Sequence, residues 1–345
     1  MKVLLIGDYP PPYGGVAVQV SALRRRLSEI PGSTCQILDI GASRRQRRPG
    51  CLAVRNPADF VGKIATHALR GYTIHLHTNG HNLKSWQITF LCGMAGMANG
   101  RRTVVSIGSG MAPDFIEQAG GFTRALIRVA LGLFGAVICR NERARCAMLH
   151  IGIPADRISI LEGFYGVRAE DLGPVPPAIE RFLQDHSPVV GAMASVGPEY
   201  GIPLLTQAAS NLHSRYPLLG LVLIGPAMPE RDGFQGGLLV TGSLPNSAVL
   251  GIMQKLDVFV RPTYFDGDAS SVREALALRV PVVASDTDFR PHGVILFRRG
   301  DSIELTRKIA FALEQERTPD PQLSPTPSKS WERLLVIYER LGAHA

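Results

Sequence analysis

Two acidic residues, Asp266 and Glu274, stand near the start of a predicted helix with seven residues between them. They lie in the segment FDGDASSVREALALRVPVVASD, Phe265–Asp286, whose pattern predicts a loop, a helix and a buried strand. Arg261 ends the strand before the loop, and Arg273 lies within the helix. A carboxylate can accept hydrogen bonds from a ribose diol, and arginines can neutralise a diphosphate. The segment therefore carries side chains that could bind a nucleotide diphosphate.

The backbone at the start of this helix offers further ligands for a phosphate, because the first N–H groups of a helix have no partner within it. We therefore include the whole loop and first turn in the candidate donor site: Gly267, Asp268, Ala269, Ser270, Ser271 and Val272. An alternative is purely structural. Ser271 as N-cap and Glu274 three residues later would form a capping box, which would explain Glu274 without a ligand.

Short apolar runs alternate with helical patterns along the chain, which predicts parallel strands joined by crossover helices. The pattern is interrupted by proline and polar residues at 171–187, where we expect a linker, and then starts again. We therefore expect two Rossmann-like, doubly wound α/β domains, residues 1–170 and 188–325, and a C-terminal helix, residues 326–345, that crosses back to the first domain. The expected strands are Lys2–Gly7, Tyr72–His77, Arg102–Gly108, Ala136–Arg140, Arg157–Leu161, Val189–Ser195, Leu219–Pro226, Gly237–Ser243, Asp257–Pro262, Val280–Ser285 and Gly293–Phe297.

The composition narrows the classes of protein. A length of 345 residues with 45% hydrophobic residues is enough for two cores. The net charge of +8 favours an anionic partner, but no nucleic-acid-binding signature is present, so we expect no nucleic acid. The five cysteines are scattered without a C-x-x-C spacing, which is typical of reduced thiols in the cytoplasm. No apolar run reaches the length of about 20 residues that a membrane span needs.

Three histidines, His75, His77 and His81, follow one another at the end of an expected strand. One of them, with His77 preferred, could assist an acceptor as a base or hydrogen-bond partner. Alternatively, His75 and His77 share one face of the strand and are packed or paired inside the protein. A zinc site is disfavoured because the sequence offers no fourth ligand, and we expect neither a metal ion nor a cofactor.

Taken in order, several segments resemble GT-B glycosyltransferases of family 4. The pair Asp266 and Glu274 is similar to the two acids that precede the family's "EA-small-x-x-G-x-P-V-V-A" motif. YPPPYGGVAVQVSALRRRL resembles the family's diglycine loop and following helix, and SWERLLVIYERL its C-terminal helix. The resemblance implies a GT-B fold, with two domains facing a cleft. It also implies that Glu274 holds the donor ribose, Asp266 contacts the transferred sugar, and Gly14 and Gly15 let the donor phosphates approach, although a plain turn would also explain the two glycines.

This sequence departs from the family pattern at several positions. Ser195 and Tyr200 stand near the expected phosphate-binding Arg and Lys, Gly108 replaces a common His, and Arg279 replaces a Gly. We therefore expect Arg261 and Arg273 to supply the cationic charge. The predicted catalytic set is Asp266, Glu274, Arg261, Arg273 and His77, and His75, His81 and Ser109 are assigned to the acceptor or sugar region.

The resemblance implies a retaining, metal-independent transfer of a sugar from a nucleotide-diphosphate sugar, with a UDP-sugar favoured over a GDP-sugar. The expected acceptor is a polysaccharide, an oligosaccharide or a lipid-linked glycan of bacterial surface-polysaccharide biosynthesis. Two other classes stay open: a sugar-nucleotide epimerase of the same fold, and a binding subunit without catalysis. An NAD-dependent dehydrogenase is disfavoured, because no G-x-G-x-x-G follows a strand.

A basic run in the first domain, Ala42–Gly50, contains Arg44, Arg45, Arg47 and Arg48. It is either an ordinary solvated surface or a contact with an anionic membrane, where each basic residue contributes roughly 1 kcal/mol. The second alternative predicts a cytoplasmic protein that binds peripherally at the inner face of the cell membrane.

Overall fold

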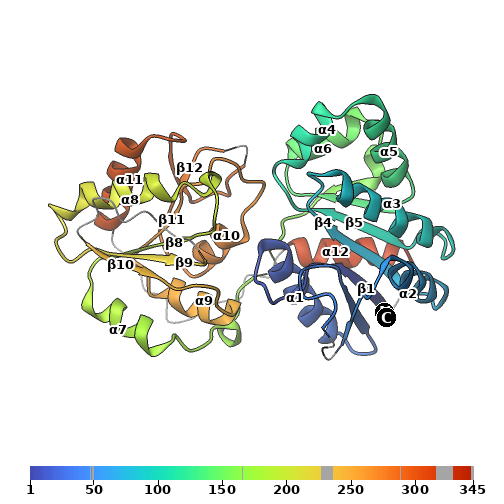
Figure 1. The fold of residues 1–345 in the computed structure, drawn as a ribbon, viewed down its shortest axis with the longest axis horizontal. Helices are drawn as coiled ribbons and strands as arrows, with labels where there is room; N and C mark the ends of the chain where they lie inside the picture. Colours follow the sequence, from blue (N-terminus) through green and yellow to red (C-terminus); the bar gives the residue numbers. More distant parts are fainter. Residues whose placement is uncertain are drawn as a thin grey trace. The chain divides into compact units, whose positions relative to one another are not determined.

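The computed structural model describes residues 1–46, 48, 50–164, 166–226, 236–287, 289–315 and 329–342. The chain divides into two compact units (Figure 1). Unit 1 comprises Met1–Tyr165 together with Pro327–Ala345, and unit 2 comprises Gly166–Thr326. None of the described helices has the length and apolar character needed to cross a membrane.

Unit 1 is built on a seven-stranded parallel sheet in the order β3-β2-β1-β4-β5-β6-β7. Its central strands are buried on both faces, as in other parallel sheets covered by helices. The strands are β1 (Lys2–Gly7), β2 (Thr34–Asp39), β3 (Cys51–Leu52), β4 (Thr73–Thr78), β5 (Thr103–Ile107), β6 (Ala136–Cys139) and β7 (Ile158–Ile160). The α-helices are α1 (Gly15–Ser28), α2 (Pro57–Leu69), α3 (Leu83–Met97), α4 (Ala112–Gln118), α5 (Gly121–Gly132), α6 (Glu142–His150) and α12 (Lys329–Arg340).

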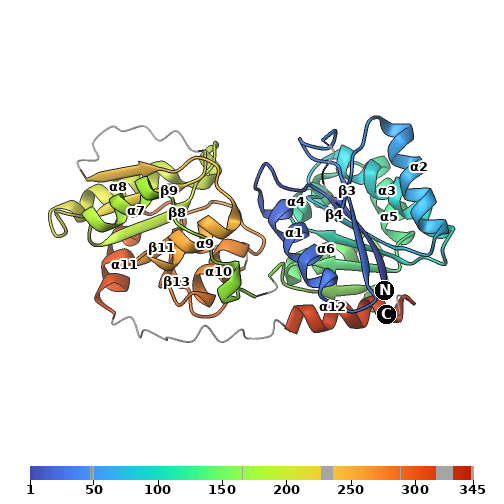
Figure 2. The same cartoon turned by 90° about the horizontal axis from the view of Figure 1, so that it is seen from below.

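The side chains of alternate β1 residues lie in two hydrophobic cores, one on each face of this sheet. Leu4 and Ile6 belong to the core formed with helices α2 to α6, and Val3 and Leu5 to the core formed with α1 and α12 (Figures 1 and 2). The period of two along a strand produces this division.

Unit 2 has a six-stranded parallel sheet in the order β10-β9-β8-β11-β12-β13. Its main core lies between this sheet and helices α8 and α11. The strands are β8 (Val189–Met193), β9 (Gly220–Ile224), β10 (Gly237–Val240), β11 (Val258–Arg261), β12 (Val282–Ser285) and β13 (Ile295–Phe297). The α-helices are α7 (Pro177–Asp185), α8 (Ile202–His213), α9 (Asn246–Gln254), α10 (Ser270–Ala277) and α11 (Ser302–Glu314).

The apolar runs identified in the sequence correspond to eleven of these strands, and β2 and β3 were missed. The segment 171–187, expected as a linker, contains helix α7, whose Ile179 is buried, and it groups with unit 2. The predicted boundary between residues 325 and 326 lies outside the described residues.

Helix α12 follows unit 2 in the sequence but packs on unit 1, where Leu334, Ile337 and Tyr338 enter the core. The Tyr338 hydroxyl lies 2.6 Å from Nδ1 of His75 in β4, and Nε2 of the same ring lies 2.9 Å from Ser106 Oγ in β5. A neutral imidazole can satisfy both contacts, with one nitrogen donating and the other accepting. A buried hydrogen-bonded chain therefore fastens the returning helix to two strands.

We predict that Tyr338→Phe lowers the free energy of unfolding by about 1–3 kcal/mol, because it leaves one His75 ring nitrogen buried without this partner. Urea denaturation followed by circular dichroism measures the change. Tyr13→Phe is the matched control, since Tyr13 is exposed. Equal stability of Tyr338→Phe and the wild type would show that this contact does not fasten α12.

Candidate functional site

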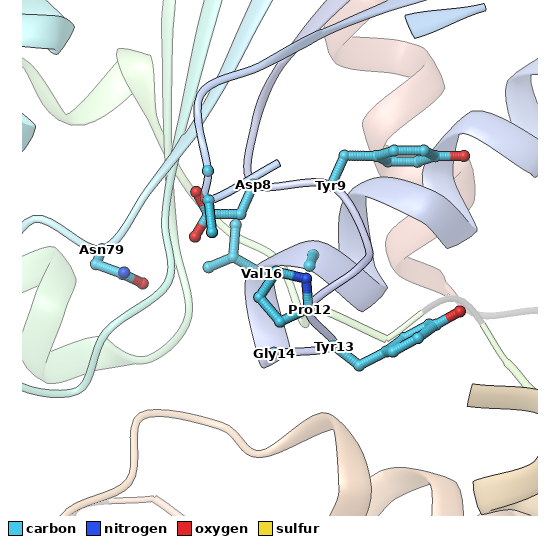
Figure 3. Close-up of a pocket in the computed structure, with 11 residues that line it drawn as sticks. Asp8, Tyr9, Pro12, Tyr13, Gly14, Val16 and Asn79 are labelled. Carbon is cyan, nitrogen blue, oxygen red and sulfur yellow. The ribbon is translucent and has the colours of Figure 1, made fainter. Parts of the chain in front are cut away.

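A pocket of about 310 Å³ lies at the carboxyl ends of the β1, β2 and β4 strands in unit 1 (Figure 3). In parallel α/β sheets, ligands bind outside this edge. The pocket is lined by Asp8, Tyr9, Pro12, Tyr13, Gly14, Gly15, Val16, Ala17, Gly41, Ala42 and Asn79. The carboxyl group of Asp8 and the amide of Asn79 are directed toward one another in this view.

The predicted diglycine pair forms part of this pocket, at the start of α1. Gly14 is the N-cap with a φ of −132°, which any residue can adopt, and a Cβ on either glycine would meet no atom within 4 Å. The fold therefore does not require glycine here. The space that the missing Cβ atoms leave is open to a ligand, next to a helix end that has no side-chain cap.

The loop before these glycines is fixed by Asp39, which ends β2. Its carboxylate accepts hydrogen bonds from the backbone N–H groups of Tyr9 and Gly41, and it forms a 2.5 Å ion pair with Arg48 Nη2. The other terminal nitrogen of Arg48 donates to the carbonyl of Pro10. Arg48 is therefore engaged within unit 1, and the prediction that it contacts a membrane does not fit its position.

The remaining residues of the basic run differ from Arg48. Arg44 and Arg45 are exposed, whereas Arg47 lies outside the described residues. Asp8 faces the pocket beside this loop. Burial raises the pKa of Asp8, the nearby charge of Asp39 adds to the effect, and Lys84 opposes it.

The predicted histidines do not form an open site in this structure. His75 and His77 are buried and stacked, with ring centroids 4.2 Å apart. Burial lowers the pKa of His77 to about 3, with a further effect from Arg140, so this ring is neutral at pH 7. The contacts of His75 match the alternative that it is paired inside the protein. His81 follows β4 in the loop before α3, and Ser109 Oγ accepts the N–H of Met111.

In unit 2, helix α10 begins at Ser270, and its N-cap residue is Ala269, which makes no side-chain cap. Ser271 is therefore inside the first turn, and the capping box between Ser271 and Glu274 does not form. The structural explanation of Glu274 was wrong, which leaves this buried carboxyl group without a role in helix capping.

Glu274 is buried, with the side chains of Asn246 and Asp171 as its polar neighbours. Burial raises its pKa to about 7, a hydrogen bond with Asn246 at the start of α9 lowers it, and the charge of Asp171 raises it. Only 8% of the residue is exposed. A glutamate that is buried near a second carboxylate is costly for folding, as binding-site acids commonly are.

The first predicted acid, Asp266, is joined to two arginines. Its Oδ2 atom lies 3.0 Å from Nε of Arg261 and 2.7 Å from Nη1 of Arg290. Burial alone would raise the pKa of Asp266, but the charges of the two arginines outweigh it and hold the pKa below its usual value. Arg290 was missed in the sequence, because it lies in the loop after β12 and belongs to no motif that we recognised.

The second predicted arginine, Arg273, pairs with Asp268 at 2.6 Å, and its guanidinium lies over the ring of Phe289. The Asp268 side chain is fully buried, so this pair holds the loop before α10 in place. Gly267, Ala269 and Val272 belong to the same loop and first turn, and Val272 is buried.

The structure shows the surroundings of the residues that depart from the family pattern. Tyr200 lies under the guanidinium of Arg261, with the centroid of its ring 5.9 Å from Cζ. Arg279 has a φ of +57°, a left-handed conformation that costs a non-glycine residue roughly 1–2 kcal/mol and explains why glycine is common there. Ser195 follows β8, and Gly108 follows β5 in unit 1, with its N–H bonded to the carbonyl of Thr78.

Comparisons with known proteins show which sequences and structures this chain resembles. Residues 187–315 match the family model described as glycosyl transferases group 1. The putative teichuronic acid biosynthesis glycosyltransferase TuaC of Bacillus subtilis is 41% identical over 88 residues, which cover 26% of this chain and 22% of that protein. The GDP-mannose-dependent alpha-mannosyltransferase of Mycolicibacterium smegmatis is 30% identical over 130 residues, 35% of this chain and 33% of that protein. The matched segments thus span a third or less of these relatives.

Solved structures match over nearly the whole chain. Anabaena HepE, solved in complex with UDP, has a TM-score of 0.63 at 17% identity, with 99% of each chain covered. Sucrose-phosphate synthase of Thermosynechococcus elongatus has a TM-score of 0.63 at 18% identity and covers 99% of this chain and 94% of its own. The protein therefore has the GT-B fold of these structures, and its residues 187–315 match the model of the group 1 glycosyl transferases.

Proposed function

We propose that the protein is a retaining glycosyltransferase that moves a sugar from a nucleotide-diphosphate sugar, with a UDP-sugar favoured, to a glycan acceptor. The observation that carries the proposal is that unit 2 contains both a cationic and a carboxyl side chain suited to a nucleotide. Both lie within the residues that match the family model. A partly exposed cation, Arg261, lies at the end of β11, and a buried carboxyl group, Glu274, lies in the helix that follows. A diphosphate suits the first group and a ribose diol the second.

In this proposal, Glu274 accepts hydrogen bonds from the ribose, and Arg261 neutralises the charge that develops on the leaving diphosphate. Positioned donors of this kind can be the main source of transition-state stabilisation, and we propose that no metal ion is required. The choice of UDP draws on HepE, which has been solved with UDP and with UDP-glucose. The open diglycine pocket of unit 1 is a second surface at which a phosphate or a sugar could bind.

For the acceptor, we propose a polysaccharide, an oligosaccharide or a lipid-linked glycan of a bacterial surface. The name of TuaC, which places that protein in teichuronic acid biosynthesis, supports this class. A cytoplasmic location with peripheral contact to an anionic membrane remains part of the proposal. Among the described arginines of the basic run, the exposed Arg44 and Arg45 are the ones suited to that contact.

We predict that UDP raises the melting temperature of the wild-type protein and that Glu274→Gln abolishes the shift, because the ribose loses its charged acceptor. The unliganded variant should remain folded, since glutamine has nearly the same shape and removes a costly buried acid. Differential scanning fluorimetry with UDP and with GDP measures both effects. Glu180→Gln, at a surface ion pair with Lys255 in the same unit, is the control and should keep the shift.

Two outcomes would contradict the proposal. Absence of binding by both nucleotides to the wild type would exclude a nucleotide site. A full shift with UDP in Glu274→Gln would exclude Glu274 as the ribose ligand.

The protonation of Glu274 gives a pH dependence with a definite sign. Its pKa is raised to about 7, so the carboxylate that accepts the ribose hydrogen bonds is lost as the pH falls through this value. We predict that the affinity for uridine decreases toward acidic pH, by about tenfold for each pH unit well below the pKa. Uridine carries no phosphate that titrates in this range, which isolates the effect of the protein.

Isothermal titration calorimetry between pH 5 and pH 8 measures this dependence, over a range of roughly 1–2 pH units on each side of the pKa. Glu274→Gln should show a flat profile. A wild-type affinity for uridine that does not change across this range would mean that no ionised Glu274 is needed for binding.

A further inference from the structure

One oxygen of the Asp266 carboxylate accepts hydrogen bonds from three side chains. Its Oδ2 atom accepts from Nε of Arg261 at 3.0 Å, from Nη1 of Arg290 at 2.7 Å and from Oγ1 of Thr263 at 3.3 Å. The Asp266 side chain is only 7% exposed. Hydrogen bonds between charged groups in such surroundings are short and strong, so the carboxylate fixes the directions of both guanidinium groups.

All three guanidinium nitrogens of Arg290 form hydrogen bonds with other residues of the protein. Its Nε donates to the carbonyl of Ser285 at 2.9 Å, and its Nη2 lies 3.2 Å from Ser285 Oγ and 3.3 Å from Thr263 Oγ1. With its bond to Asp266, this guanidinium spans the ends of β11 and β12, and its side chain is 4% exposed. It is therefore placed to hold neighbouring groups and has no free edge for a ligand.

Arg261 has the opposite character. Nε is bonded to Asp266 and one guanidinium face lies over Tyr200, but within the described part of the chain neither Nη1 nor Nη2 has a hydrogen-bond partner. The side chain is 15% exposed. One edge of a planar, fixed guanidinium is thus left for an anion, in the geometry that binds phosphate oxygens in pairs.

The charges of this cluster do not balance. Two arginines share the single carboxylate of Asp266, so the triad of Arg261, Asp266 and Arg290 carries a net charge of +1. The neighbouring pair of Arg273 and Asp268 is neutral. A largely buried excess of positive charge is unfavourable unless an anion compensates it. The exposed edge of Arg261 is where that anion can bind.

We propose that Arg290 is a positioning residue for the donor diphosphate: acting through Asp266, it orients Arg261 so that the Nη edge of Arg261 binds the phosphates. This inference rests on the proposed function and deepens it. Asp266 then organises the cation, a role different from the contact with the transferred sugar that the family resemblance implies. The cluster also supplies the charge that the residues at Ser195 and Tyr200 cannot.

A double-mutant cycle tests this coupling. Calorimetry measures the affinities for UDP and for uridine in the wild type, Arg261→Gln, Arg290→Gln and the double variant. Each single substitution should weaken UDP binding by about tenfold, and the double variant should bind no more weakly than Arg261→Gln alone, since Arg290 acts through Arg261. Uridine affinity should not change, because uridine has no phosphate.

The outcomes separate this inference from the proposed function. If the wild type binds neither UDP nor GDP, the function and the inference both fail. If the wild type binds UDP but the two losses add, if Arg290→Gln binds UDP normally, or if uridine binding falls as much as UDP binding, the positioning role alone is overturned.

Two further variants keep the test decisive. If Arg290→Gln fails to fold, Arg290→Lys replaces it in the test. Lysine retains the charge but cannot make the same set of hydrogen bonds, so Arg290→Lys should also weaken UDP binding. Normal UDP affinity in folded Arg290→Lys would overturn the inference. Arg215→Gln, at an exposed ion pair with Glu314 in the same unit, is the control and should bind UDP as the wild type does.

Discussion

One carboxylate, that of Asp266, is shared by two arginines and fixes the arrangement of side chains at the carboxyl ends of β11 and β12. Asp266 joins the β11–α10 loop to Arg290, which in turn is bonded to the end of β12. The arrangement is specific because a single oxygen receives donors from three side chains, and each donor comes from a different position along the chain. Its excess charge faces outward through Arg261. A structure that only needed stability would have no reason to leave that charge uncompensated, because removing the excess arginine would cost less than burying it.

Glu274 complements this cation in the same unit. It does not cap its helix, it has no ion pair among the described residues, and its pKa of about 7 reflects the cost of burial. The uncompensated charge at Arg261 and the buried carboxyl group of Glu274 are both unfavourable in the unliganded protein, and the ligand that we propose, with hydroxyl donors at one end and phosphates at the other, would compensate both. The side chains that best indicate function are therefore those whose surroundings are least favourable without a ligand.

Much of the fold could be predicted from the sequence because a parallel strand buried on both faces leaves a short, nearly uninterrupted apolar run, as in KVLLIG of β1. The β2 strand, TCQILD, begins with exposed and polar residues, and β3 has only two residues, so neither carries that pattern. This omission had a consequence. Asp39 ends β2, and without it the partner of Arg48 could not be identified, so Arg48 was interpreted as a surface residue.

The sequence indicated several residues of the candidate site, but it did not indicate which of them contact one another. Asp266, Glu274 and Arg261 stand in a segment with a recognisable spacing. Arg290, however, lies 24 residues after Asp266, and only the pairing of β11 with β12 brings the two together. The choice of Ser271 as a cap failed because the helix begins at Ser270 after Ala269, a residue type that a cap preference does not predict. The ion pair between Asp268 and Arg273, five residues apart, links the loop to the first turns of the helix.

The most direct test of this account is a crystal structure of the protein with UDP bound. We predict that the diphosphate lies within hydrogen-bonding distance of Nη1 and Nη2 of Arg261, that Arg261 keeps its bond to Asp266, and that the ribose hydroxyls contact Glu274. A complex in which the phosphates bind elsewhere, with no contact to Arg261, would contradict the central claim.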